Sequence, residues 1–182
     1  MQPVKQLAQV LVKLADESHA LFSLADLRAA LPGHHPGAFR ALISRAEKDG
    51  MLRRVCQGLY LYPRANYPGG LILWHAAARL RADAFNYISL ESALSDAGVI
   101  SQIPMNRVTL MSSGRSATIR CGEYGAIEFV HTKKRPAEVA DQLTYDARCH
   151  LWRAPVILAI KDMKAARRSL DLVDWGVVDE SV

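Results

Sequence analysis

Residues 36–63 read PGAFRALISRAEKDGMLRRVCQGLYLYP, and this stretch decides the fold of the N-terminal part of the chain. Its first half is typical of a helix over about 36–49, because Pro36 suits a first helical turn and Gly50 suits the residue after the last turn. Its second half contains two strand-like runs on either side of Gln57-Gly58, where glycine supplies the backbone angles of a tight turn. The stretch therefore predicts a helix followed directly by a β-hairpin.

The two sides of this helix differ in chemistry. An apolar inner face consists of Phe39, Leu42, Ile43 and Ala46. The residues expected to point outward are Arg40, Ser44 and Lys48, together with His35, Gly37 and Ala41, and Arg45 is expected near the border. One apolar face indicates that the helix packs on a core, and the opposite face is left for solvent or a partner.

Two further helices are expected upstream. Apolar residues recur every three or four positions over 4–20, and Ser23 can cap a helix over about 24–31 that Pro32-Gly33 ends. The expected order is thus helix, helix, helix, hairpin within about 60 residues. This is the winged helix-turn-helix arrangement, in which the third helix enters the major groove of DNA and the hairpin, or wing, lies along the backbone.

Positive charge is concentrated on the same elements. Residues 28–54 contain six basic and two acidic side chains, so this stretch has a net charge of +4, whereas the rest of the chain has only +1 of the total of +5. Arg40 and Ser44 are one turn apart and can face one groove, where arginine binds guanine through two hydrogen bonds. Lys48 and the hairpin arginines suit phosphates. The residues expected to contact DNA are His35, Arg40, Ser44, Arg45, Lys48, Arg53, Arg54 and Gln57, and the alternative is a charged face exposed only to water.

The second part of the chain predicts a separate α/β domain. Residues 64–70 are rich in turn formers and suggest a linker, so the expected domains are 1–63 and 71–182. The sequence predicts helices at 71–82, from Ser89 to about Ala97, at 136–142 and at 161–173, and strands at 87–88, 107–112, 117–121, 126–131 and 154–160. Residues 107–131 are expected to form an antiparallel set. The predicted fold class is α+β, a winged helix-turn-helix followed by a small mixed domain with an antiparallel sheet.

Several kinds of chemistry find no support in the sequence. The three cysteines are widely spaced and form no CxxC pair, which argues against a disulfide framework and a structural zinc site. No apolar run approaches the roughly 20 residues of a membrane-spanning helix, and no signal peptide is recognisable. Cys149-His150 contains nucleophile and base types, but adjacent side chains seldom point the same way. We therefore expect a cytoplasmic protein without membrane contact, catalytic site, metal or cofactor.

Basic side chains recur in the second domain. They are Lys133, Lys134 and Arg135 after an expected strand, and Lys164 and Arg168 on an expected helix. These residues could provide a second phosphate contact or bind an acidic partner surface. The alternative is that they are solvated.

The stretch Tyr87–Ile100, YISLESALSDAGVI, resembles the AbiEi family of antitoxins, which are transcriptional regulators of type IV toxin–antitoxin and phage-defence operons. The family pattern has a winged helix closing on Gly-hydrophobic-Tyr, here Gly58-Leu59-Tyr60, and then a Ser-Leu-Glu-Ser-Ala-Leu helix that ends in glycine and is followed by strands. The resemblance covers roughly residues 5–160. Residues 154–162, APVILAIKD, correspond to a family segment in which a glutamate follows the proline, and this chain lacks that glutamate.

The resemblance implies a repressor that binds double-stranded DNA at its own promoter, on inverted repeats and as a dimer. It also implies that the chain counters a co-encoded nucleotidyltransferase-like toxin, largely without a stable complex. One alternative is a winged-helix module that binds proteins and has no specific DNA binding. An enzyme that acts on nucleic acid ranks last, because no cluster of carboxylates supports it.

Overall fold

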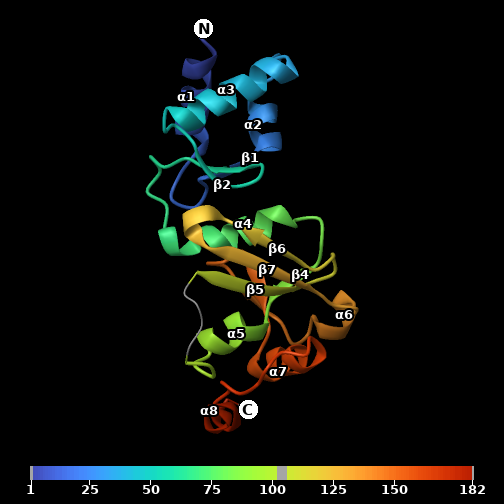
Figure 1. Cartoon of the computed structure of the whole chain (residues 1–182). Coiled ribbons are helices and arrows are strands. Elements are labelled where there is room, and N and C mark those ends of the chain that lie inside the picture. Colours follow the sequence, from blue (N-terminus) through green and yellow to red (C-terminus); the bar gives the residue numbers. More distant parts are fainter. Residues whose placement is uncertain (1, 102–105, 182) are drawn as a thin grey trace. The chain divides into compact units, whose positions relative to one another are not determined.

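The chain folds into two units, Met1–Ile72 and Leu73–Val182, which together combine helices with antiparallel and mixed sheets in an α+β fold (Figure 1). The structure is a computed structural model, and it describes residues 2–101 and 106–181. No helix among these residues has the length and apolar character needed to cross a membrane. Each unit is described by itself.

The first unit contains three helices and a three-stranded sheet. Its elements are α1 (Pro3–Leu14), β1 (Leu21–Ser23), α2 (Leu24–Ala30), α3 (Pro36–Lys48), β2 (Arg53–Cys56) and β3 (Leu59–Leu61). The strands are antiparallel in the order β1-β3-β2, with the two-residue turn Gln57-Gly58 between β2 and β3. Gly58 has a φ of +76°, which confirms the expected need for glycine at this turn. The three helices and the hairpin are thus present, and β1 is an additional strand.

The expected helix over 4–20 is wrong at its C-terminal end, because α1 stops at Leu14. The carboxylate of Asp16 accepts hydrogen bonds from the backbone N–H groups of Ser18 and His19, both at 2.8 Å. Such a local side-chain bond competes with helical hydrogen bonding and favours a turn. Residues 15–20 therefore lie outside the helix and lead into β1, which pairs with β3.

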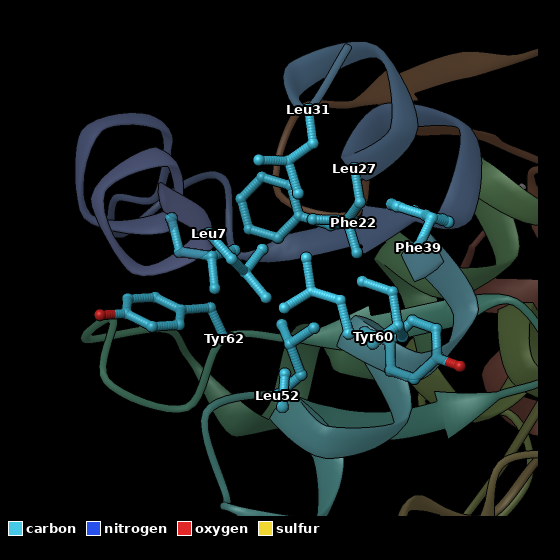
Figure 2. Packing of buried hydrophobic residues seen from close by; sticks show 12 residues of the cluster. Leu7, Phe22, Leu27, Leu31, Phe39, Leu52, Tyr60 and Tyr62 are labelled. Carbon is cyan, nitrogen blue, oxygen red and sulfur yellow. The ribbon is translucent and has the colours of Figure 1, made fainter. Parts of the chain in front are cut away.

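The core of the first unit collects residues from every one of its helices (Figure 2). Phe22 from β1 and Leu27 from α2 lie among the four predicted inner residues of α3, all of them buried. The other members of the cluster are Leu7, Leu11, Leu31, Leu52, Tyr60 and Tyr62. This packing fixes which side of α3 faces inward and leaves its basic side exposed.

The second unit is built on a six-stranded sheet in the order β6-β7-β5-β4-β9-β8. The strands are β4 (Asn86–Ile88), β5 (Arg107–Ser112), β6 (Ala117–Arg120), β7 (Ala126–His131), β8 (Thr144–Asp146) and β9 (Leu151–Arg153). The helices are α4 (Ile72–Leu80, which begins at the unit boundary), α5 (Leu90–Asp96), α6 (Pro136–Val139), α7 (Val156–Ala165) and α8 (Trp175–Glu180), with a short 3-10 turn η2 (Gly122–Tyr124). Another 3-10 turn, η1 (Gly69–Leu71), lies at the end of the first unit. Helices α5 and α7 pack on one another, and α5 packs on β5.

The expectation of an antiparallel set over 107–131 is confirmed for β6 and β7 but wrong for β5, which pairs with β7 in parallel. Residues 113–116 carry the chain past β7, so β6 becomes the edge strand and pairs with β7 alone. Gly125, with a φ of +114°, lies before β7, and a Cβ there would come within 1.9 Å of the carbonyl oxygen of Asn106. The bare glycine allows the backbone N–H of Ala126 to donate to that carbonyl at 2.8 Å, which seats β7 beside β5.

The strand expected at 154–160 is also wrong, because these residues lead into and begin helix α7. Pro155 caps the helix, and Leu158, Ala159 and Met163 are buried at helical spacing, whereas Ile157 is 40% exposed. A short apolar run fits either a buried strand or one side of a helix, and here the packing against α5 decides for the helix. The helix expected at 161–173 accordingly begins at Val156 and ends at Ala165.

Candidate nucleic-acid interface

The outer side of α3 is basic and exposed. Arg40, Ser44, Arg45 and Lys48 are all exposed, and Gly37 and Ala41 between them add almost no bulk. Across residues 2–101 and 106–181, the structure records no ion pair for Arg40, Arg45 or Lys48. Three cationic groups on one helix therefore remain available for an anionic partner.

The hairpin adds two arginines, both from β2. Arg53 and Arg54 are both exposed, and a bulge lies between Arg54 and Cys56. The Arg54 guanidinium donates to the Tyr60 hydroxyl at 3.3 Å and lies 3.8 Å from the Glu47 carboxylate. Arg54 is thus oriented by its own fold, and Glu47 offsets part of its charge. Gln57 is exposed at the tip of the hairpin.

His35 forms the N-terminal cap of α3. Its Nδ1 accepts a hydrogen bond from the backbone N–H of Gly37 at 3.3 Å. This bond requires that Nδ1 carry no proton, so Nε2 is the ring nitrogen that can donate. The side chain is exposed beside the first turn of α3, where backbone N–H groups favour anions.

Most of the basic residues that the sequence predicts as a second phosphate or partner contact form ion pairs within the second unit. Lys134 Nζ lies 2.5 Å from an Asp162 carboxylate oxygen, and Arg135 pairs with Glu138 at 3.4 Å. Arg168 bridges Glu128 at 2.6 Å and Glu91 at 3.5 Å. Lys133 and Lys164 are exposed. Three of these five residues are therefore paired with carboxylates of their own unit.

Sequence reasoning missed a buried polar centre around Asp162. This residue is fully buried on α7, and one of its oxygens accepts from the Tyr87 hydroxyl at 2.9 Å and from the Ser89 hydroxyl at 2.7 Å. Burial raises the pKa of Tyr87, and the neighbouring Asp162 charge raises it further. The signal was present in the sequence, because an aspartate among Leu158, Ala159 and Met163 interrupts an otherwise apolar pattern.

The expectation that Ser89 caps α5 with its hydroxyl is wrong. The hydroxyl donates to Asp162 instead, and the residue that follows, Leu90, has a φ of +58°. Ser92 and Thr109 exchange hydrogen bonds of 2.9 and 3.0 Å between side chain and backbone and join α5 to β5. The segment 87–98 and residue 162, which both belong to the stretches quoted for the AbiEi resemblance, therefore meet in one network.

Cys149 and His150 do not form a nucleophile–base pair. Cys149 is buried, and burial together with the nearby Asp146 charge raises the pKa of its thiol to about 11. The His150 ring stacks on His75 with 4.1 Å between ring centres. Among the described residues, no group of three or more His, Cys, Asp or Glu side chains is placed to hold a metal ion.

Residues 30–145 match a family of unknown function designated DUF6088. The chain belongs to this family. The matched residues include α3 and the β2–β3 hairpin and continue through the sheet of the second unit as far as β8. A search of curated proteins finds no match to this chain.

Proposed function

We propose that the first unit is a winged helix that binds double-stranded DNA, with α3 in the major groove and the β2–β3 hairpin as the wing. The observation that supports this most directly is the outer side of α3, where Arg40, Arg45 and Lys48 are exposed and without ion pairs across the described residues. DNA presents closely spaced phosphates, and cations that no internal partner neutralises are the groups that bind them.

The order of elements supports the same proposal. The chain runs α1-β1-α2-α3-β2-β3, and β1 completes a small sheet with the hairpin. In helix-turn-helix proteins the second helix of the motif, here α3, carries the side chains that reach bases. The proposal assigns base contact to the basic side of α3 and backbone contact to the hairpin that follows it.

The side chains divide into two roles in this proposal. Arg40 and Ser44, one turn apart, read base edges, and the small residues Gly37 and Ala41 let the helix approach the groove floor closely. Arg45, Lys48 and Arg53 contact phosphates, which adds affinity without sequence readout. Arg54 is held by Tyr60 and serves chiefly to order the wing.

The resemblance to AbiEi antitoxins extends the proposal to the whole chain. In this form the protein is a cytoplasmic repressor of its own operon, binds inverted repeats as a dimer and counters a co-encoded toxin. Co-expression with the neighbouring gene tests this extension. If expression of that gene arrests growth and the intact chain relieves the arrest, the antitoxin role is supported. If the chain does not relieve the arrest, the antitoxin role is contradicted, and the proposal of DNA binding is unaffected.

The deciding experiment is a fluorescence anisotropy titration of the full chain on its own upstream DNA, with scrambled DNA of equal length as the reference. Arg40→Ala is expected to weaken binding to the upstream fragment roughly 10- to 100-fold, because a bidentate arginine–guanine contact discriminates by about 1–3 kcal/mol. Lys13→Ala on α1 removes the same charge from another exposed position and serves as the control.

Two outcomes are distinguishable. Preferential binding to the upstream fragment that Arg40→Ala alone abolishes supports sequence-specific recognition by α3. Equal, weak binding to both fragments, unchanged by either substitution, contradicts the proposal and favours a winged helix that binds proteins.

A further inference from the structure

The second unit contains a pocket of about 350 Å³ between the end of β7 and helix α7. Met111 and residues 131–134 line one side, and Asp162, Ala165 and Ala166 line the other. A volume of this size lies at the lower end of the range for small-molecule sites, which are largely apolar with a few placed polar groups.

Asp162 fixes the position of one cationic group in this pocket. One of its oxygens is taken by the hydroxyls of Tyr87 and Ser89, and the other accepts from Lys134 Nζ at 2.5 Å. The Asp162 side chain is fully buried, so its oxygens accept hydrogen bonds from groups of the protein itself. The Lys134 side chain, in contrast, is 33% exposed. An ammonium group has three N–H donors, and the bond to Asp162 uses one of them. The others are available to a molecule in the pocket.

The balance of charge in the pocket is positive. Lys133 is exposed beside Lys134, and no ion pair involves it among the residues that the structure describes. Two lysines against one aspartate leave a formal net charge of +1. His131 and Thr132 add polar groups, and Met111, Ala165 and Ala166 form the apolar part of the lining. An occupant that matches this lining carries a negative oxygen group at one end and a compact apolar or flat body at the other.

The backbone behind the pocket is strained in a way that fits a ligand site. Leu90 has a φ of +58°, in the left-handed region that non-glycine residues seldom adopt, although it is buried. This turn directs the Ser89 hydroxyl to Asp162 instead of to the start of α5. Strained backbone that orients polar groups collects at ligand sites.

We propose that this pocket binds a small organic oxyanion, whose phosphate or carboxylate is held by Lys133 and Lys134 and whose body contacts Met111, Ala165 and Ala166. Asp162 acts as a positioning residue for Lys134 and does not touch the ligand. The site is independent of the DNA-binding surface proposed on α3.

The test is an NMR titration of the ¹⁵N-labelled full chain with four anions: adenosine 5′-monophosphate, ribose 5-phosphate, benzoate and inorganic phosphate. Adenosine is the uncharged reference. Saturable shifts of the amides of residues 133, 134, 165 and 166 are expected with at least one of the three organic anions and not with adenosine. Response to the phosphates or to benzoate distinguishes phosphate from carboxylate recognition.

Three variants make the test specific. Lys133→Gln is expected to raise the Kd roughly tenfold, the effect of losing one charge-assisted contact. Lys161→Gln removes the same charge from α7 outside the pocket and is expected to leave the Kd unchanged. Ala165→Leu fills part of the pocket and is expected to abolish binding. Thermal unfolding of each variant checks that the fold is retained.

Two results would overturn the proposal. One is the absence of saturable shifts at the pocket residues with all three organic anions, whether or not inorganic phosphate causes such shifts. The other is binding that Lys133→Gln and Lys161→Gln weaken equally, or that Ala165→Leu leaves intact, since either pattern places the anion elsewhere on the surface.

Discussion

Asp162 shows how one charged residue can organise a domain. It lies fully buried on α7 and collects hydrogen bonds from Tyr87, Ser89 and Lys134, which come from β4, the start of α5 and the segment after β7. A carboxylate with three donors is well satisfied, whereas the donors lose their acceptor if it is removed. The residue therefore connects segments that are far apart in the sequence.

Replacing Asp162 by alanine is expected to lower the free energy of unfolding by about 3 kcal/mol, because breaking a buried ion pair leaves the partner groups without an acceptor. Tyr87→Phe, which removes one hydroxyl and keeps the ring, is expected to cost about 1 kcal/mol. Urea unfolding measures both. Asp179→Ala on the exposed side of α8 is the control, and a loss at Asp162 no larger than at Asp179 would show that the network contributes little.

The stability of the protein is expected to fall as the pH rises from about 9 to about 11. The thiol of Cys149 has an ordinary pKa near 9 in the unfolded chain and a pKa raised to about 11 in the fold. The unfolded state therefore loses its proton first, so the stability from this group is present below pH 9 and is lost as the pH approaches 11. Urea unfolding at pH 8 and pH 10.5 is expected to differ less in Cys149→Ala than in the unmodified chain; an equal difference would assign the effect to other groups.

At the scale of elements, local patterns were predictable and distant pairings were not. Helix α3 and the β2–β3 hairpin follow from Pro36, Gly50 and Gly58, whose effects act within a few residues. The exposed positions of the candidate DNA-binding residues followed from the same periodicity. The strands β5 and β7 pair although β6 lies between them in the sequence, and no short-range pattern predicts this parallel pairing. For α7, an apolar run fits two structures, and packing decides between them.

Capping of α3 offers a way to separate stability from DNA binding. His35→Asp is expected to raise the free energy of unfolding by about 0.5–1 kcal/mol, because aspartate caps helices well and its charge suits the N-terminus. The same substitution is expected to weaken DNA binding, since a carboxylate beside the basic side of α3 repels phosphates. Urea unfolding and anisotropy titration measure the two effects.

The matched control for this substitution is Gln2→Asp. Gln2 is the N-cap residue of α1, makes no side-chain cap bond and is exposed, so the change adds a negative charge and a capping side chain at the start of another helix. It is expected to stabilise the fold and to leave DNA affinity unchanged. Equal weakening of DNA binding by both variants would point to a general effect of charge and away from contact at α3.

At the scale of the whole molecule, positive charge is distributed unevenly. Residues 28–54 hold most of the net charge, and in the second unit Lys134, Arg135, Arg153 and Arg168 are paired with carboxylates. A protein with this distribution concentrates its attraction for polyanions on one short segment of the chain.

The salt dependence of DNA binding is expected to reflect this distribution. If Arg45, Lys48 and Arg53 neutralise about three phosphates, the logarithm of the association constant falls by roughly 3 for each tenfold rise in salt concentration. Anisotropy titrations between low and physiological salt measure this slope. Lys48→Ala is expected to reduce it by about one. A slope near zero would mean that phosphates are not the partner.

The position of β7 between β6 and β5 sets an order in which the larger sheet can assemble during folding. The β6–β7 hairpin closes over a short turn, which costs little chain entropy, whereas β5 is parallel to β7 and no tight turn can join such a pair. Refolding chains are therefore expected to protect the amides of β6 and β7 from hydrogen exchange before those of β4 and β9. A Cβ at Gly125 would meet the carbonyl of Asn106 beside β5, so Gly125→Ala obstructs the docking of a hairpin that has already formed.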